Sequence, residues 1–269
     1  MTSPPAPVLS LFLLFLLIAY PLCHAAAPLT EYCSYDKKAS SAAKANIARV
    51  LATLQSNAPS NGFYTASYGT GSVDRAYGLA QCRQDVSVED CRICLRDAPP
   101  QLSKRCKGQA EAWMWFDYCF VRYDTTPFTG KFDSGYGVYD YSEYNVTENV
   151  VEQRRFDREL RSLLGKVKTQ AAARGNLGLG RDQTKFSSAV TIYALAQCTR
   201  DLPSQACSKC LSTEIGYFAQ FCPQRKACRG LTSGCYLRYE IYPFFFPLSP
   251  GSPKASLAAE PLVSKVVSP

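Results

Sequence analysis

The cysteines are the residues of this chain whose type and spacing point most directly to chemistry. Thirteen are present, beside a single histidine, His24. Cys91-x2-Cys94 and Cys207-x2-Cys210 have the spacing of a zinc knuckle, which is also the C-x-x-C spacing of thioredoxin-like redox sites. A framework of structural disulfides is the third use of such cysteines, and it is common in secreted chains.

The first residues of the chain decide among these uses, because they indicate secretion. The apolar run over 8–20 is short for a membrane span and is followed by the small residues 25–27. We predict a signal peptide over 1–25, with a signal anchor as the alternative. Cleavage removes Cys23 and His24, which leaves twelve cysteines and no histidine for a catalytic triad, a Cys-His pair or a metal site. Disulfides are therefore favoured over zinc and over redox chemistry, and we expect no metal and no cofactor.

An internal repeat organises the segments that position the cysteines. The pattern C-x8-C-x2-C occurs within 77–95 and again within 193–211, at an offset of 116 residues. Cys106 recurs as Cys222 at the same offset. A period of this length fits a whole domain and is too long for a solenoid repeat, so we predict a tandem of two related domains that pack together.

Apolar periodicity predicts the first elements of each domain. Residues 45–55 carry the apolar stripe of an amphipathic helix, and 156–167 repeat that stripe in the second half. The aromatic and β-branched runs 62–68 and 73–81 indicate an antiparallel hairpin. The expected fold class is α+β, in which each disulfide-bridged domain is an antiparallel β-sheet packed with two helices.

The remaining elements carry the cysteine motif. Ser87 is a helix N-cap with Asp90 three residues later, so a second helix is predicted to begin there and to end before Pro99-Pro100. The aromatic run 113–123 predicts one long strand.

Composition gives the domain boundaries. We predict a first domain over 26–130, a short ordered connector over 131–144 and a second domain over 145–246. The Gly-rich segment 175–180 lacks the lysine of a phosphate loop and is predicted to be a turn. Prolines interrupt 247–269, which is predicted to be a disordered tail without a membrane anchor.

The fuller motif carries a family resemblance. Both repeats run from Y-x-L-A-Q-C-x8-C-x2-C-L through C-x11-C-x12-C to Arg-Tyr-acid-x-x-Pro-Phe. In this the chain resembles the plant cysteine-rich repeat secretory proteins, whose domains are called ginkbilobin-2-homologous or salt-stress/antifungal domains. The resemblance covers roughly 33–128 and 145–245.

Spacing alone does not choose among the fifteen pairings of six cysteines. The resemblance implies, for the first domain, the pairs Cys33–Cys106, Cys82–Cys91 and Cys94–Cys119. In the second domain no cysteine corresponds to Cys33, and Cys228 is additional. We therefore predict the pairs Cys198–Cys207, Cys210–Cys235 and Cys222–Cys228.

The resemblance also implies a candidate sugar site. A mannose-binding antifungal seed protein of this kind uses an Asn after the first cysteine, an Arg before the last cysteine and a Glu after it. The first domain has Ser34, Trp113 and Asp124 at these positions, so there only an aromatic that could stack on a sugar remains. The second domain keeps Arg229 and Glu240 but no Asn, which predicts weak binding through one donor and one acceptor. The alternative is that Arg229 and Glu240 form a surface ion pair without a ligand.

Together with these features, the resemblance implies a secreted, non-enzymatic, apoplastic binding protein of the plant stress or defence type. Its partner would be a mannose-containing glycan or a cell-wall polysaccharide. The alternative is a protein-interaction module without sugar binding, whose partner is an extracellular receptor or another secreted protein. A glycosidase needs two carboxylates and no histidine, but no carboxylate pair here has motif support. The net charge of +8 indicates only general attraction to acidic surfaces, and the cluster of arginines over 154–161 favours a solvated helix face over a nucleic-acid site.

We predict an N-linked glycan at Asn145, because Asn145-Val146-Thr147 is an N-x-S/T sequon in a secreted chain. Enzymatic deglycosylation of the plant-expressed protein should lower its mass, and Asn145→Gln should lower it to the same value. The sequon would be shown to be unused if deglycosylation left the mass of the protein unchanged and if Asn145→Gln differed in mass from the wild type only by the substituted side chain.

Overall fold

The computed structural model describes residues 27–71, 74–133, 135–246 and 262–268. The predicted signal peptide lies outside the described residues, as do residues 247–261 of the predicted tail over 247–269. Among the described residues, no helix has the length and apolar character needed to cross a membrane.

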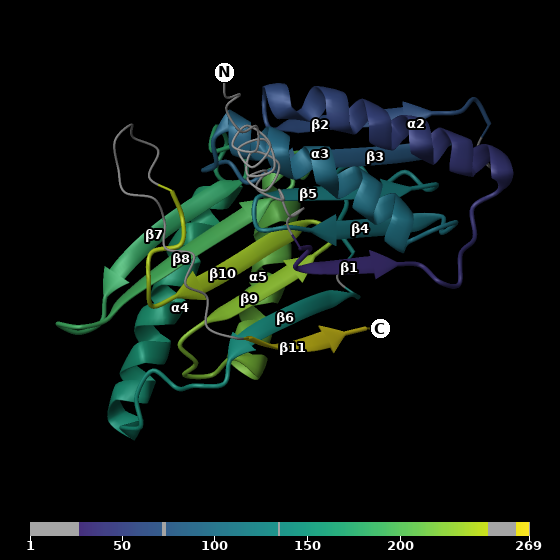
Figure 1. The fold of residues 1–269 in the computed structure, drawn as a ribbon. Helices are drawn as coiled ribbons and strands as arrows, with labels where there is room; N and C mark the ends of the chain where they lie inside the picture. Colours follow the sequence, from purple (N-terminus) through teal and green to yellow (C-terminus); the bar gives the residue numbers. More distant parts are fainter. Residues whose placement is uncertain (1–26, 72–73, 134, 247–261, 269) are drawn as a thin grey trace, which may run out of the picture.

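The first domain is a five-stranded antiparallel sheet with two helices on one face (Figure 1). The strand order is β1-β4-β5-β3-β2. Its elements are β1 (Thr30–Cys33), α2 (Ser41–Asn57), the short 3-10 helix η1 (Ala58–Ser60), β2 (Phe63–Tyr68), β3 (Ala76–Cys82), α3 (Val88–Arg105), β4 (Glu111–Trp115) and β5 (Cys119–Asp124).

The second domain repeats this plan with a six-stranded antiparallel sheet, in the order β11-β6-β9-β10-β8-β7. Its elements are β6 (Gly137–Ser142), α4 (Val150–Ala172), β7 (Leu179–Lys185), β8 (Thr191–Cys198), α5 (Ser204–Phe221), β9 (Cys228–Thr232), β10 (Cys235–Glu240) and β11 (Leu262–Val267). The predicted α+β class, with two helices on each sheet, is confirmed.

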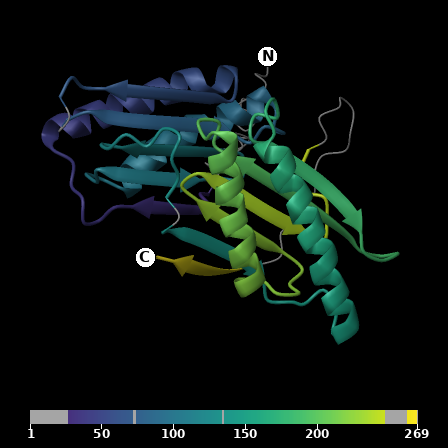
Figure 2. The ribbon, with the colours of Figure 1, turned by 180° about the vertical axis from the view of Figure 1, so that it is seen from behind.

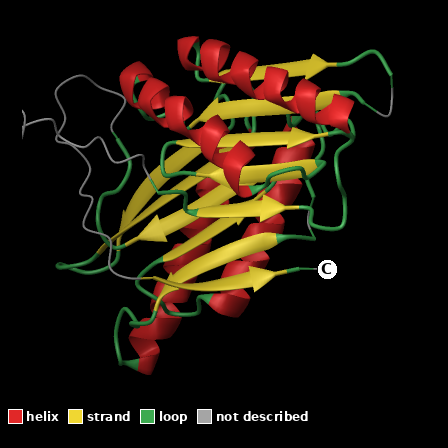
Figure 3. Cartoon of the chain, turned by 45° about the vertical axis from the view of Figure 1, so that its right-hand side comes forward, coloured by secondary structure: helices red, strands yellow, loops and turns green. Residues whose placement is uncertain are grey.

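The two sheets face each other, and the helices lie on the two outer sides. Helices α2 and α3 are in front of the first sheet in Figure 1, whereas α4 and α5 are behind the second sheet and come forward in Figure 2. Figure 3 shows the strands of both domains between the two helix pairs. One apolar cluster joins the facing sides, and its sheet residues are Leu79, Trp113, Trp115, Phe120, Val138, Leu179, Leu195, Leu231 and Tyr236.

Burial on both faces explains the aromatic density of the central strands. In β10, Tyr236 faces the first domain, whereas Leu237 and Tyr239 belong to the core beneath the helices of the second domain. Successive side chains of a strand point to opposite faces, so a strand covered on both sides has no exposed position. Every residue of β10 is buried accordingly.

Polar contacts between the domains follow the 116-residue repeat. The Gln81 side chain donates Nε2–H to the Cys198 carbonyl at 2.9 Å and accepts the Arg200 amide at 2.7 Å. In return, the Gln197 side chain accepts the Gln84 amide at 3.2 Å. Because each glutamine reaches the loop that follows the other, the domains are related in this region as in a two-fold dimer.

A second reciprocal pair fixes the end of each domain. The Asp85 carboxylate accepts the amide of Phe246 at 2.9 Å, and the Asp201 carboxylate accepts the amide of Gly130 at 2.8 Å. Each aspartate follows the Ala-Gln-Cys motif of its own domain by the same number of residues. The segment that ends one domain is therefore held by the other.

Two predictions about single elements are wrong. Helix α3 begins at the predicted cap, where the Ser87 hydroxyl accepts the Asp90 amide, but it continues through Pro99 and Pro100 to Arg105. The carbonyl of Arg96, which Pro100 cannot satisfy, accepts the Gln55 side-chain amide of α2 at 2.6 Å instead.

The predicted strand 113–123 is a hairpin of two strands, β4 and β5. The turn between them is closed by the Phe116 amide, which donates to the Cys119 carbonyl at 2.8 Å. The aromatic run therefore crosses the sheet twice, and it brings Asp117 to the end of the hairpin.

The segment 131–144 is not only a connector, because it contains β6. Strand β6 pairs with β9 as β1 pairs with β4: Asp140 lies opposite Arg229, and Tyr32 lies opposite Trp113, the residue that corresponds to Arg229 in the first repeat. The second sheet thus begins before the predicted boundary.

The end of the predicted tail is also ordered, since β11 pairs with β6 over six residue pairs. Val267 packs against the second core, and the Ser264 hydroxyl donates to Asp140 Oδ1 at 2.5 Å. A β-branched stretch at the chain end is enough to pair with an open strand edge.

Six disulfides link the elements, and they join the same cysteines as the expected pairs. In the first domain Cys33 of β1 lies opposite Ala112 of β4, and in the second Tyr141 of β6 lies opposite Cys228 of β9. The bridging cysteine has therefore moved to the neighbouring strand at an equivalent height in the sheet. The disulfides are Cys33–Cys106, Cys82–Cys91, Cys94–Cys119, Cys198–Cys207, Cys210–Cys235 and Cys222–Cys228.

The second core contains a buried carboxyl group where the first core has Ala98. Glu214 of α5 is fully buried, and its Oε1 accepts the Tyr139 hydroxyl at 2.8 Å. Its Oε2 has no partner among the described residues. This oxygen lies where a Cβ atom at position 230 would be, and it fits there because residue 230 is a glycine. Burial raises the pKa of Glu214 from 4.5 to about 8, so the group is neutral in the folded protein over most of the physiological range.

We expect this carboxyl to make stability fall as pH rises. Between pH 4.5 and about 8 the unfolded chain loses the Glu214 proton while the folded chain keeps it. The free energy of unfolding should therefore decrease with pH, by at most ~1.4 kcal/mol per pH unit for one group. Glu214→Gln should remove this slope. Urea unfolding at several pH values would contradict the account if the difference between the variant and the wild type did not grow from pH 5 to pH 8.

Candidate functional site

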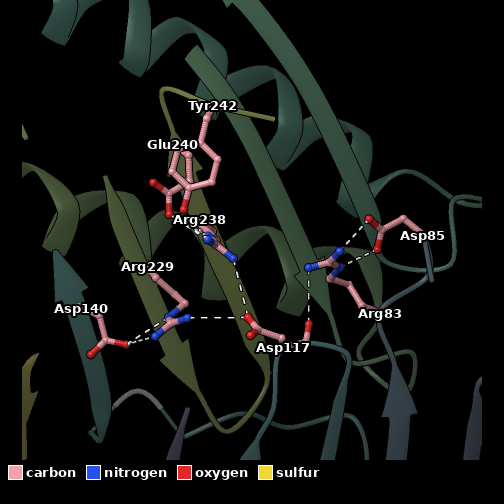
Figure 4. Close-up of polar contacts among 8 residues, drawn as sticks. All are labelled: Arg83, Asp85, Asp117, Asp140, Arg229, Arg238, Glu240 and Tyr242. Carbon is pink, nitrogen blue, oxygen red and sulfur yellow. Dashed lines mark hydrogen bonds and ion pairs between the residues drawn. The ribbon is translucent and has the colours of Figure 1, made fainter. Parts of the chain in front are cut away.

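A row of charged side chains crosses the second sheet on the face that meets the first domain. Register places Asp140 of β6 opposite Arg229 of β9, and Arg229 opposite Arg238 of β10. Glu240 lies two residues further along β10 and so on the same face. These residues form the left part of the cluster in Figure 4.

Each arginine of this row has its own carboxylate. Arg229 donates through Nε and Nη2 to Asp140 Oδ2 at 3.0 and 2.6 Å. Arg238 donates through Nε to Glu240 Oε1 at 3.0 Å and through Nη2 to the Tyr242 hydroxyl at 3.2 Å. Charge-assisted hydrogen bonds of this kind hold guanidinium groups in fixed orientations.

The first domain contributes Asp117, from the turn between β4 and β5. Its Oδ1 lies 3.8 Å from Arg229 Nη1 and 3.7 Å from Arg238 Nη1. These are ion pairs longer than hydrogen bonds. Because the Asp117 side chain is 48% exposed, whereas that of Arg229 is 13% exposed, the site is composite and opens to solvent at the junction of the domains.

Arg83 and Asp85 form the right part of the cluster in Figure 4. Arg83 Nε and Nη2 donate to the two oxygens of Asp85 at 2.6 and 3.0 Å, and Nη1 donates to the Asp117 carbonyl at 3.4 Å. The guanidinium also lies over the rings of Tyr118 and Phe246. The Arg83–Asp85 pair is buried, and the hydrogen bond from Arg83 to the Asp117 carbonyl anchors the turn between β4 and β5.

Burial and charge act in opposite directions on the titratable groups. Burial raises the pKa of Glu240, and the neighbouring Arg238 acts against this rise. Burial alone would lower the pKa of Arg238, but Tyr236 and the carboxylates of Glu240 and Asp117 hold it above its ordinary value. The site is therefore a network of ion pairs.

The structure brings Arg229 and Glu240 onto one face but does not pair them with each other. Glu240 is 2% exposed and is oriented by Arg238, and Arg229 is occupied by Asp140. The surface ion pair between Arg229 and Glu240, which was the alternative to a sugar site, is not present, because each residue has a nearer partner.

The corresponding positions of the first domain are structural. Trp113 is 1% exposed and packs in the interdomain core against Tyr32 and Tyr136, so it is not available to stack on a sugar. The Ser34 hydroxyl donates to the Glu111 carbonyl, and Asp124 Oδ2 lies 3.8 Å from Arg122 Nη2.

Sequence reasoning missed Asp117, Asp140 and Arg238. The repeated Arg-Tyr-acid ending contained a signal for Arg238, since it places an arginine two residues before Glu240 on the same side of a strand. Asp140 lies in the segment predicted to be a connector, and nothing in the sequence near Asp117 marked a turn. Among the described residues, no cluster of His, Cys, Asp and Glu could hold a metal ion.

Comparisons with known proteins agree with this architecture. Residues 30–126 and 143–242 match the family model described as salt stress response/antifungal. The chain is 41% identical over 246 residues to cysteine-rich repeat secretory protein 55 of Arabidopsis thaliana, covering 90% of this chain and 92% of that protein. It is 35% identical to an antimicrobial ginkbilobin-2-like protein of Castanea crenata, covering 86% of this chain and 95% of that protein.

A solved structure shares the fold. The tandem DUF26 ectodomain of the Arabidopsis thaliana cysteine-rich receptor-like protein PDLP8 superimposes with a TM-score of 0.67 at 24% identity. The match covers 79% of this chain and 97% of that ectodomain. The resemblance inferred from the cysteine motifs is confirmed.

Two of the three aspartates of the cluster, Asp85 and Asp117, should differ sharply in their contribution to stability. Asp85→Ala leaves Arg83 as an uncompensated buried charge and removes the acceptor of the Phe246 amide, which should cost about 3–5 kcal/mol. Asp117→Ala removes only long, half-exposed ion pairs, which should cost less than about 1 kcal/mol. Denaturant unfolding of both variants measures this difference, and equal costs would contradict the assignment of Asp85 as the buried anchor.

Proposed function

The chain belongs to the salt stress response/antifungal family, whose domain it carries twice, and on that premise we propose that it is an apoplastic stress or defence protein that acts by binding a glycan, without catalysis. One relative is named a cysteine-rich repeat secretory protein and another an antimicrobial ginkbilobin-2-like protein, and both names support this proposal. The binding site that we propose is the composite cluster at the domain junction, with Arg229 as its central donor.

One observation supports a hydroxyl-rich ligand at this cluster. For Arg229 Nη1 and Arg238 Nη1, the partner among the described residues is Asp117 Oδ1, at a distance longer than a hydrogen bond. Two guanidinium donors and one half-exposed carboxylate acceptor are thus held by buried partners with hydrogen-bonding capacity unused. Sugar hydroxyls, which donate and accept, could use both.

The geometry changes the roles that the family resemblance implies for Arg229 and Glu240. Glu240 is too deeply buried to accept a hydrogen bond from a ligand directly, so in this proposal it orients Arg238. Asp117 takes the part of the exposed acceptor, and the ligand meets residues of both domains. The absence of an Asn at the site agrees with weak binding.

Titration of mannose and of mannan into the wild type and three variants tests the proposal. Arg229→Ala and Asp117→Ala should each weaken binding about tenfold, the effect of losing one charged hydrogen bond, whereas Glu240→Gln should weaken it less. Arg92→Ala, on the exposed side of α3, serves as the control and should bind like the wild type.

Binding that Arg229→Ala and Asp117→Ala both leave unchanged would place the glycan elsewhere. If the wild type binds neither sugar, the glycan proposal fails and the alternative, an interaction module for an extracellular receptor or a secreted protein, is favoured.

A further inference from the structure

A groove lies between α4 and α5, on the outer side of the second domain. Its volume is about 300 Å³, at the lower end of the range for small-molecule sites. Apolar side chains form most of its lining, chiefly Leu160, Leu164, Ile215 and Phe218. The second sheet lies between this groove and the charged cluster at the domain junction, because α4 and α5 cover the side of that sheet that faces away from the first domain (Figure 2).

The first domain provides an internal comparison for this groove. At the positions of Ile215 and Gly216 the first repeat has Pro99 and Pro100 in α3. A pyrrolidine ring thus stands where the second domain has no side chain. A Cβ atom at Gly216 would meet no other atom within 4 Å, so the groove is open at that point.

The two helices of each domain are bridged at one end. Gln55 of α2 donates to the Arg96 carbonyl of α3 at 2.6 Å, and Lys168 of α4 donates to the Ser212 hydroxyl of α5 at 3.3 Å. Arg96 and Ser212 are equivalent in the repeat. The helices of the second domain are therefore fixed at one end, and the open part of the groove runs from this bridge toward Asp157 and Pro223.

The lining of the groove contains one carboxylate, that of Asp157, and one guanidinium, that of Arg161. Of the charged residues in its lining, Asp157 already accepts the amide and the side chain of Gln224 at 3.3 and 3.2 Å. Arg161 is exposed and has neither an ion pair nor a hydrogen bond within the part of the chain that the structure describes. Arg158 precedes it by three residues and so lies on the same side of α4.

The dimensions limit the ligand. The lining residues of α5 and its C-terminal end extend from Ser212 to Cys222, which is roughly 15 Å along the helix axis. A helical peptide about 10 Å in diameter and 15 Å long would occupy roughly 1,200 Å³, well above the volume of about 300 Å³ that the groove provides. A single extended hydrocarbon chain fits both the length and the volume.

We propose that this groove binds a single-chain carboxylate amphiphile, such as a medium-chain fatty acid, with the chain on Leu160, Leu164 and Phe218 and the carboxylate on Arg161. Each methylene group removed from water contributes about 0.8 kcal/mol, so a chain of this length supplies most of the affinity. The guanidinium fixes the orientation of the chain through a charge-assisted hydrogen bond.

Calorimetric titration of the full chain with decanoate, below its micellar concentration, tests the proposal. We expect saturable binding of one decanoate per chain. Gly216→Leu should abolish it, because the new side chain occupies the groove, and Arg161→Ala should weaken it about tenfold, the effect of losing one charged hydrogen bond. Lys166→Ala, an exposed cation on another side of α4, is the matched control and should not change the affinity.

Decanol separates the contribution of the chain from that of the charge. It should bind the wild type about tenfold more weakly than decanoate does, and Arg161→Ala should not weaken it further. Circular dichroism of Gly216→Leu should match the wild type, and Arg161→Ala keeps the test decisive if that variant does not fold.

Absence of saturable decanoate binding would overturn the proposal, as would binding that Gly216→Leu and Arg161→Ala leave unchanged. Binding of an acidic amphipathic peptide in place of decanoate would overturn it as well. The sugar titration does not involve this groove, so the two proposals fail independently.

Discussion

The burial of the central strands of each sheet on both faces is the constraint on which this structure depends. Helices cover the outer face of each sheet, and the inner faces cover each other through one apolar cluster. Neither inner face could be left in water, because Trp113, Trp115, Phe120 and Tyr236 would form a large exposed apolar patch. The reciprocal bonds of Gln81 and Gln197, and those of Asp85 and Asp201, add directionality to this contact. We therefore expect the two repeats, which are arranged as in a dimer, to unfold as one unit.

The candidate site exists because the two repeats differ at a few positions of this shared face. Arg122 and Arg238 are equivalent, and each lies over a phenylalanine, Phe128 or Phe244, at 4.1 and 4.4 Å. At the next strand the repeats diverge, since the first carries Trp113 in the core and the second carries Arg229. A guanidinium at the edge of an apolar interface needs counter-charges. Asp140 supplies one from within the domain, and Asp117 supplies the other from the partner repeat.

The sequence predicted much of this fold because its strongest signals are local or repeated. The amphipathic stripes located α2 and α4, the Ser87 cap located α3, and the repeat located the equivalent cysteines. What it missed depends on contacts between distant segments. Helix α3 passes its prolines because Gln55, in another helix, satisfies a carbonyl. Strand β6 lies within the presumed connector, and β11 ends a proline-rich tail, because a sheet edge pairs with each of them. At the site, Arg229 and Glu240 were identified from the resemblance, but Asp117 comes from a turn that only tertiary pairing brings near them.

Hydrogen exchange across a denaturant series, followed by mass spectrometry, tests most directly whether the two repeats form one cooperative unit. The peptides to compare are those of β3 and β5 in the first domain and those of β8 and β10 in the second, with all disulfides intact. If the shared face holds the sheets together, both pairs of strands lose protection at the same denaturant concentration, in one transition. Loss of protection in one domain at a clearly lower concentration, while the other keeps its full protection, would contradict this account.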